Sequence, residues 1–346
     1  MSLILPYDQW PASDRTMWTA LRKPGGPFDD RGALTDLRET SMETLQNRYG
    51  RWLEWLRRSD PAALEAPPAV RVTLPRLASW LEALAHTAPM SRLMFVDGVL
   101  RIASAAAPEA DWTCHRRVKA KLQRAAARGD PARKAGRVLS SRMLLDAGRE
   151  LAGPGAEAAT TPLQRAVRHR NGTMVAFLAM IPIRRRAFAG LRIGKALIIT
   201  PEVLILDLPG DLTKNRLPYE GHVGEPVAGL MRSYLEQTRP FLLARGEQSH
   251  DWLWVGDRGQ PLSYAWIGPK IAGITERLTG KRIPPHFFRD AAATTLAHES
   301  PEAARMIGPV LGHTATGTAE RHYIQADSVE AARDYAAVVR ELRGKR

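Results

Sequence analysis

The residues best suited to chemistry lie in the last part of the chain, and they are two histidines, an arginine and a tyrosine. His286 and Arg289 are three positions apart, so they share one face if this stretch is helical. His313 follows 24 residues after Arg289, and Tyr323 follows ten residues later. Arginine offers a planar fork of N–H donors that suits a phosphate group, and histidine moves protons near neutral pH. A tyrosine hydroxyl becomes a nucleophile when its neighbours activate it, so this set predicts phosphoryl transfer through a covalent phosphotyrosine.

Each of these features also has a simpler interpretation. A His-x-x-Arg pair usually belongs to a solvated helix surface, and the stretch Leu311-Gly312-His313 is typical of a helix end with glycine in the left-handed conformation. A tyrosine beside an isoleucine, as at Tyr323, is more often packed than reactive. The order and spacing of the three motifs favour the catalytic interpretation, because three independent coincidences would otherwise have to occur together.

The order His-x-x-Arg, Leu-Gly-His, Tyr resembles the catalytic domain of the tyrosine recombinases, the phage integrase family. This family also has an arginine after a buried helix and a lysine on a β-hairpin. Residues 163–182 predict a helix whose second half, 174–181, is apolar all round and therefore buried. Three arginines follow it, and aligning Leu191-Arg192 with the family pattern makes Arg184 the catalytic one.

Two positions near Arg184 depart from the family pattern. Pro182 stands where the family has glycine, and Ala187 stands where it has an acidic residue that orients the site. Arg185 and Arg186 therefore remain alternatives to Arg184.

The β-rich runs 196–199 and 203–206, followed by 213–218, predict a small antiparallel three-stranded sheet. Lys214 lies in the hairpin before the last strand, where the family places its mobile catalytic lysine; the alternative is an ordinary exposed turn lysine. The resemblance thus implies six catalytic residues, namely Arg184, Lys214, His286, Arg289, His313 and Tyr323.

Composition and charge narrow the class of partner. A chain of 346 residues is long enough for two domains, and its net charge of +14 favours a polyanionic partner, although an arginine-rich genome composition would give the same excess. We find no run of eighteen apolar residues and no signal-peptide pattern at the start. The single Cys114 excludes an intrachain disulfide, and no Cys/His cluster has the spacing of zinc ligands. These features favour a reducing cytoplasm.

The sequence predicts a mainly α fold with a small antiparallel β-sheet. The parts we expect are an irregular N-terminal arm with one short helix (1–38), a helical domain (39–151), a flexible linker rich in small residues (152–162) and a catalytic α+β domain (163–346) that ends in an amphipathic tail helix. In the family, the helical part is the core-binding domain, which grips DNA. Between Arg116 and Arg137 there are nine Lys or Arg against the single Asp130, so this run is either a phosphate-binding face or a solvated surface. The DNA-binding candidates are Arg116, Arg117, Lys119, Lys121, Arg124, Arg133 and Lys134.

The resemblance implies a site-specific DNA recombinase or integrase of a mobile element, acting in the nucleoid. Its partner would be double-stranded DNA with inverted-repeat sites, bound as a homotetramer, with possible accessory directionality or partner recombinase proteins. No cofactor or metal is implied. The alternatives are a type IB topoisomerase or telomere resolvase, which share the chemistry, and a DNA-binding protein of the same fold that lacks catalysis.

Overall fold

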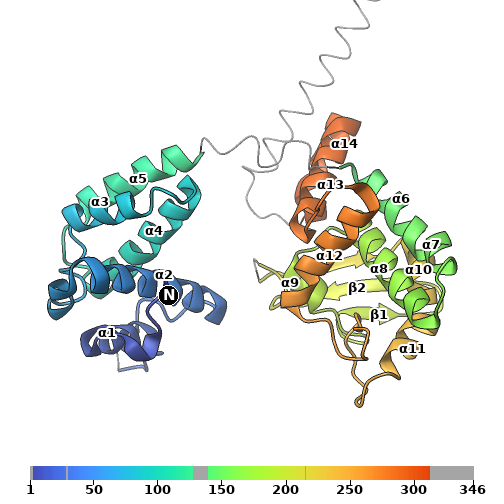
Figure 1. Cartoon of the computed structure of the whole chain (residues 1–346), viewed down its shortest axis with the longest axis horizontal. Helices are drawn as coiled ribbons and strands as arrows, with labels where there is room; N and C mark the ends of the chain where they lie inside the picture. Colours follow the sequence, from blue (N-terminus) through green and yellow to red (C-terminus); the bar gives the residue numbers. More distant parts are fainter. Residues whose placement is uncertain (1–2, 29, 128–138, 215, 312–346) are drawn as a thin grey trace, which may run out of the picture. The chain divides into compact units, whose positions relative to one another are not determined.

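The computed structural model describes residues 3–28, 30–127, 139–214 and 216–311. The chain forms two compact units, residues 1–131 and 132–346, which are considered separately (Figure 1). Both are mainly helical, and the sheet found in the described part of the chain belongs to the second unit. The mainly α fold class with a small antiparallel sheet is therefore confirmed.

The first unit is built from helices that surround a tryptophan-rich core. Its elements are η1 (Tyr7–Gln9), α1 (Ala12–Arg22), α2 (Glu39–Ser59), η2 (Pro61–Glu65), α3 (Leu74–Ala83), α4 (Pro89–Ala106) and α5 (Thr113–Ala127). Four fully buried tryptophans lie in this core: Trp10, Trp18, Trp52 and Trp80. Thr73 caps α3, because its hydroxyl accepts a hydrogen bond from the Arg76 amide at 3.3 Å.

The N-terminal arm is part of this core. Trp10 and Trp18 are each 1% exposed, and the Trp10 indole donates a hydrogen bond to the Leu5 carbonyl at 3.0 Å. The short helix expected near residues 14–21 is α1. The arm thus packs onto the helical unit.

A buried ion pair fastens the arm. Asp14 and Arg71 are both fully buried, and their Oδ2 and Nη1 atoms are 2.6 Å apart. The Tyr49 hydroxyl donates to the other Asp14 oxygen at 2.7 Å, and Arg71 also donates to the Ala66 and Leu64 carbonyls. Two buried charges are tolerated here because each of them has several hydrogen-bond partners.

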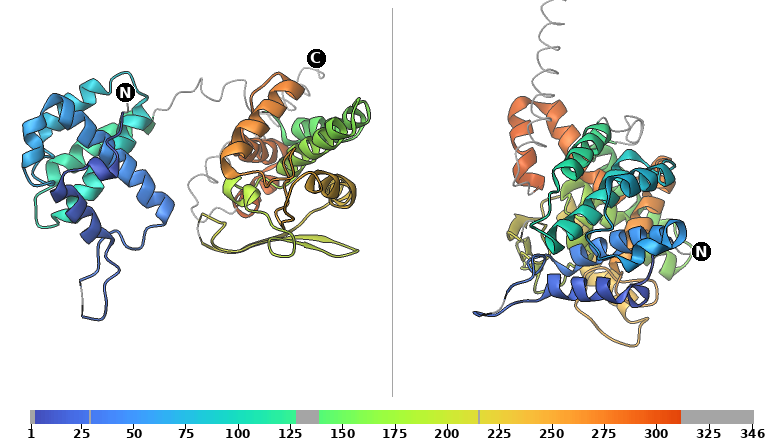
Figure 2. Two further views of the ribbon diagram at one scale, coloured as in Figure 1. Left: turned by 60° about the horizontal axis from the view of Figure 1, so that its bottom comes forward. Right: turned by 90° about the vertical axis from the view of Figure 1, so that its left-hand side faces the viewer.

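The second unit packs its helices around one buried helix and against a small sheet (Figures 1 and 2). Its helices are α6 (Ser141–Ala152), α7 (Pro154–Glu157), α8 (Pro162–Met180), α9 (Arg185–Ala189), α10 (Val227–Ser233), the π-helical turn η4 (Tyr234–Thr238), α11 (Arg239–Leu243), α12 (Tyr264–Thr279), α13 (Pro285–Glu299), α14 (Pro301–Arg305) and α15 (Ile307–Leu311). Most of the predicted buried run 174–181 is buried, with residues 174–179 at most 4% exposed, whereas Met180 at the end of α8 is 37% exposed. None of the described helices combines the length and the apolarity that crossing a bilayer requires.

The flexible linker expected over residues 152–162 is not where the chain divides. This stretch contains α7 and the start of α8, and the boundary between the two units falls near residue 131. Two glycines bring α6 and α8 together: a Cβ atom at Gly172 would lie 2.4 Å from the Ala152 nitrogen, and one at Gly148 would lie 2.6 Å from the Ala176 nitrogen. Small residues are compatible both with a flexible chain and with close packing of helices. At the contact between α6 and α8 they allow close packing.

The three strands are β1 (Leu197–Ile199), β2 (Leu204–Leu208) and β3 (Tyr219–His222), paired antiparallel in that order. The third strand begins at Tyr219, later than the expected 213–218, and Lys214 lies in the β2–β3 connection, as predicted. In β2 the burial alternates, with Leu204, Leu206 and Leu208 buried, because the helices cover one face of the sheet (Figure 2).

Candidate active site

Two arginines that are more than a hundred positions apart in the sequence line the same cavity. Arg184 stands directly before α9, at the end of the short extended segment that follows α8, and Arg289 lies on α13. The cavity has a volume of about 230 Å³, several times the roughly 30 Å³ that one water occupies in the liquid. Its other walls are mainly apolar and include Leu208, Leu217 and Leu311.

Backbone carbonyls hold the Arg289 guanidinium in place. Its Nη1 donates to the Pro182 carbonyl at 2.8 Å, and its Nη2 donates to the Leu311 carbonyl at 2.7 Å. These bonds join α13 to the segment before Arg184 and to the end of α15. The orientation of the Arg289 guanidinium is therefore held by two separate stretches of backbone.

The electrostatics of the cavity favour an anion. Burial lowers the pKa of Arg289 to about 10, and the positive charge of Arg184 acts in the same direction, while Asp290 and Tyr219 oppose the shift. Burial also lowers the pKa of Arg184. Two partly buried cations with like charge that line one cavity would both gain from a negative ligand bound there.

The structure separates the three consecutive arginines that follow α8. Arg184 lines the cavity, whereas the Arg185 guanidinium lies 3.9 Å from the centre of the Tyr264 ring, in a cation–π contact. The Arg186 residue is exposed and is not among those that line this cavity. This distribution supports Arg184 as the candidate phosphate ligand.

Ala187, the position where an acidic residue was expected, also lines the cavity and is 3% exposed. No carboxylate can be supplied from there. The orientation of Arg289 comes instead from the carbonyl of Pro182, the other residue that departs from the family pattern.

Lys214 is exposed and follows a cavity-lining residue, Thr213. The Thr213 hydroxyl lies 3.1 Å from the Gly210 carbonyl and 2.7 Å from the Leu217 carbonyl, which closes the base of this loop. Arg216 has a φ angle of 60°, a left-handed conformation that is unfavourable for arginine. A tightened loop thus presents Lys214 next to the cavity wall.

His286 is exposed in the first turn of α13, where its ring packs edge-on against Phe287, with 4.7 Å between ring centres. It precedes Arg289 by one turn but is not among the lining residues. His313 and Tyr323 lie outside the described residues, so their placement stays a prediction.

The sequence missed two residues of interest. Tyr219, the first residue of β3, lines the cavity together with Arg184 and Arg289. It directly follows Leu217-Pro218, so its place on the last strand was the available signal. The other missed residue is Arg101 of α4, which lines a separate hollow with Arg116 and Lys119 of α5.

The candidate DNA-binding residues of α5 differ in their surroundings, and Arg116 is exposed at the hollow that it lines with Arg101. Arg117, Lys121 and Arg124 are exposed and follow the spacing i, i+4, i+7, so they share one face. Lys119 is instead held by Asp97 of α4, with their charged atoms 2.5 Å apart. Arg133 and Lys134 lie outside the described residues.

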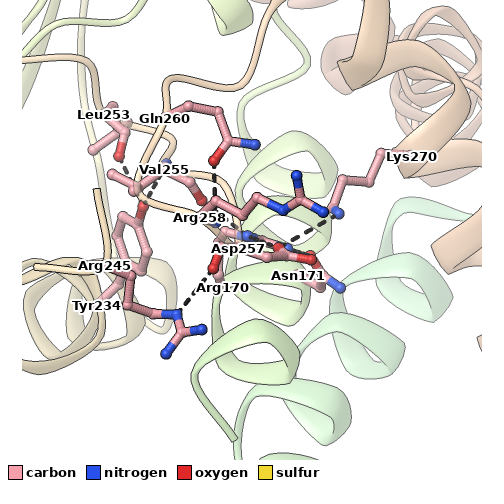
Figure 3. A network of polar contacts seen from close by, with 10 residues as sticks. All are labelled: Arg170, Asn171, Tyr234, Arg245, Leu253, Val255, Asp257, Arg258, Gln260 and Lys270. Atoms are coloured by element: carbon pink, nitrogen blue, oxygen red, sulfur yellow. Dashed lines mark hydrogen bonds and ion pairs between the residues drawn. The ribbon is translucent and has the colours of Figure 1, made fainter. Parts of the chain in front are cut away.

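A buried polar network supports α8 away from the cavity (Figure 3). The Arg170 side chain is fully buried and donates to the Asp257 carboxylate at 2.7 Å and to the Val255 carbonyl at 2.9 Å. Lys270 of α12 approaches the same carboxylate at 3.8 Å. Because these partners already satisfy Arg170, this cation serves the structure of the unit.

Parts of the chain are similar to known proteins. Residues 158–330, half of the chain, match the model of the phage integrase family. Over 85 residues the chain is 31% identical to the tyrosine recombinase XerC of Bacillus subtilis (strain 168). That stretch is 24% of this chain and 28% of XerC, so the chain spans little more than a quarter of that relative's length.

Several solved structures share the fold, and two of them serve as examples. One is the XerH site-specific recombinase bound to its difH substrate in a pre-cleavage complex, with a TM-score of 0.56 and 14% identity over 85% of this chain and 79% of that chain. The other is the Tn1549 transposon integrase in complex with transposon right end DNA, with a TM-score of 0.50 and 14% identity over 87% of this chain and 95% of that chain.

Proposed function

The chain belongs to the phage integrase family, and from this premise we propose that it is a tyrosine-type site-specific DNA recombinase. The observation that carries the proposal is the shared cavity of Arg184 and Arg289, two cations that lie apart in the sequence and line one cavity of about 230 Å³. A DNA phosphodiester is the anion that suits a chain with a net charge of +14.

In the proposed reaction, the Tyr323 oxygen attacks the scissile phosphorus and forms a 3′-phosphotyrosyl bond, while the bond from phosphorus to the 5′-oxygen breaks. Arg184 and Arg289 bind the non-bridging oxygens and stabilise the charge that develops on them. The tyrosine proton passes to His286, and the departing 5′-oxygen takes a proton from Lys214. His313 donates a hydrogen bond to the phosphate.

Strand exchange completes the cycle. The 5′-hydroxyl of another strand attacks the phosphotyrosyl bond and releases Tyr323, so the energy of the original bond is kept in the intermediate. Two duplexes cut at two positions each would need four copies of Tyr323. We therefore propose that the protein acts as a homotetramer on inverted-repeat DNA sites of a mobile element. Accessory proteins would set the direction of recombination, and the reaction would take place in the cytoplasm, at the nucleoid.

The first unit would hold the DNA through its cations. Arg117, Lys121 and Arg124 form one exposed face of α5, and the hollow lined by Arg101 and Arg116 adds two further positive charges. Neutralising phosphates releases counterions, so binding would weaken steeply as salt rises.

A nicked suicide substrate tests the proposal. The duplex carries inverted repeats identified in the DNA that flanks the coding sequence, with a nick that lets the 5′-hydroxyl fragment diffuse away. We expect the wild-type chain to be trapped as a covalent complex, and Tyr323→Phe to bind the same DNA without trapping. Tyr335→Phe, which removes the same hydroxyl twelve positions later, is the matched control and should trap normally.

A DNA-binding protein without catalysis is the second candidate, favoured by Ala187 at a cavity position where the family pattern has an acid. Wild-type chain that binds the repeats but forms no covalent complex would support it. Covalent trapping without strand exchange between two sites would point to a type IB topoisomerase or telomere resolvase.

A further inference from the structure

Tyr219 lies at the same cavity as the two arginines, but it comes from a different element. It opens β3, opposite Leu208 of β2, and both residues line the cavity. The burial of β3 alternates, so Tyr219 and Gly221 are half-buried while Glu220 is exposed. The strand therefore turns the tyrosine toward the covered side of the sheet.

The space around the phenol is kept open by a glycine. A Cβ atom at Gly221 would lie only 3.3 Å from the Tyr219 oxygen, so a larger residue there would crowd the hydroxyl. Over residues 3–28, 30–127, 139–214 and 216–311, no group forms a hydrogen bond with this hydroxyl.

Among the described residues, two fully buried tyrosines differ from Tyr219 in this respect. The Tyr234 hydroxyl donates to the Leu253 carbonyl at 2.8 Å, and the Tyr49 hydroxyl donates to Asp14 at 2.7 Å. Each of them has a structural partner, whereas the Tyr219 hydroxyl is left for a ligand of the cavity.

Burial and the charges around the cavity determine the protonation state in which Tyr219 would contact that ligand. Burial raises the pKa of Tyr219, and the positive charge of Arg289 only partly opposes this. The phenol is therefore protonated at neutral pH. In that form it is a poor nucleophile but a good hydrogen-bond donor to an anionic oxygen.

We propose that Tyr219 is a further catalytic residue, whose hydroxyl donates a hydrogen bond to a non-bridging oxygen of the scissile phosphate held by Arg184 and Arg289. This role rests on the proposed recombinase function. It gives the phosphate a neutral donor from the sheet, in addition to the two cations from the helical side of the cavity. Because Tyr219 follows directly on the Lys214 loop, the strand that carries the donor also anchors the loop that carries the acid.

The test combines a tyrosine substitution with a change in the phosphate. Cleavage rates of the nicked substrate are measured for the full-length wild type and for Tyr219→Phe, on a normal phosphodiester and on both methylphosphonate isomers at the scissile position. Each isomer replaces one non-bridging oxygen by a methyl group. Tyr7→Phe, in the first unit, is the matched control because it also removes one phenol hydroxyl.

We expect Tyr219→Phe to bind the duplex normally and to cleave the phosphodiester about 10- to 100-fold more slowly, as for loss of one hydrogen bond to a charged group. The ratio of wild-type to variant rates should fall to about one on the isomer that lacks the contacted oxygen. It should persist on the other isomer. A residue that acts only through packing would give the same ratio on all three substrates.

The outcomes separate this role from the proposed function. If the wild type traps no covalent complex, the recombinase function fails, and the role of Tyr219 fails with it. If the wild type cleaves and Tyr219→Phe matches it, or the ratio is unchanged on both isomers, only the role of Tyr219 is overturned. Tyr219→Leu guards against a folding defect: it should lose as much rate as Tyr219→Phe, and a much larger loss together with a lower Tm would indicate a packing role.

Discussion

Arg184 and Arg289 line one cavity, and the charge of Arg184 is, after burial, the second cause that lowers the pKa of Arg289 to about 10. The two like charges therefore destabilise the site, and an anion in the cavity would offset this. Catalytic sites often keep such an arrangement at a cost to folding stability.

Replacing Arg184 by glutamine should stabilise the protein while it abolishes cleavage. The charge that opposes Arg289 is removed, and if the relief amounts to about 1 kcal/mol the Tm rises by about 2–4 °C for a unit of this size. Covalent trapping should fall by roughly 10²- to 10³-fold, as for loss of one oxyanion donor. Differential scanning calorimetry checks the first effect. The control Arg186→Gln removes an exposed arginine outside the cavity and should leave the Tm nearly unchanged; equal shifts in both variants would contradict the explanation.

Sulfate should stabilise the free protein by binding between the two arginines. An anion that binds only the folded state raises stability by RT ln(1 + [L]/Kd), so the Tm should climb with sulfate concentration. The rise should be much smaller in Arg184→Gln, measured against sodium chloride of the same ionic strength. Identical curves for the two proteins would show that sulfate acts elsewhere.

Anion binding should weaken as the pH approaches and passes 10. The pKa of Arg289 is lowered to about 10, so its guanidinium is cationic below that pH and progressively neutral above it. For folding the sign is opposite: the unfolded chain keeps this proton to higher pH, so the penalty for charged Arg289 is fully present below 10 and declines above it. Sulfate titrations between pH 8 and 10.5 report the first effect. In Arg184→Gln the loss should move to higher pH, and an unmoved profile would exclude Arg289 as its source.

Removing the carboxylate of Asp97 should strengthen DNA binding by the first unit. Lys119 is now paired with Asp97, with 2.5 Å between their charged atoms, and Asp97→Asn frees the ammonium group for a phosphate. The slope of log K against log salt should become steeper by about one. Fluorescence anisotropy at several salt concentrations measures it. Glu109→Gln removes an exposed carboxylate from the same unit. If Glu109→Gln steepens the salt dependence as much as Asp97→Asn does, the release of Lys119 is not the cause.

Breaking the buried pair of the N-terminal arm should strongly destabilise the first unit. Asp14→Asn leaves the Arg71 charge buried and unpaired, which costs about 3–5 kcal/mol. Urea unfolding followed by tryptophan fluorescence detects the loss, since Trp10 and Trp18 lie in the same core. Asp8→Asn changes an exposed carboxylate of the same arm and should stay within about 0.5 kcal/mol of the wild type.

Much of the fold was predictable because it follows from local rules. The apolar run 174–181 required a largely buried helix, and only Met180 within it is exposed. The threonine and proline that begin α3 are likewise typical of a helix start. The placement of Lys214 between β2 and β3 followed from the alternation of strand and turn residues. The expectation of a linker over residues 152–162 was wrong, because Ala152 packs against Gly172 of α8 and residues 154–157 form the short helix α7.

The sequence by itself determined the family, the type of fold and the set of six candidate catalytic residues, of which His313 and Tyr323 stay predictions. Only the tertiary structure decided that Arg184, rather than Arg185 or Arg186, shares a cavity with Arg289, that Tyr219 joins them, and that Asp97 holds Lys119. The physical reason is that propensity and periodicity act over a few neighbouring residues. The direction of a side chain, and the segment it meets from a hundred positions away, are set by packing of the whole unit.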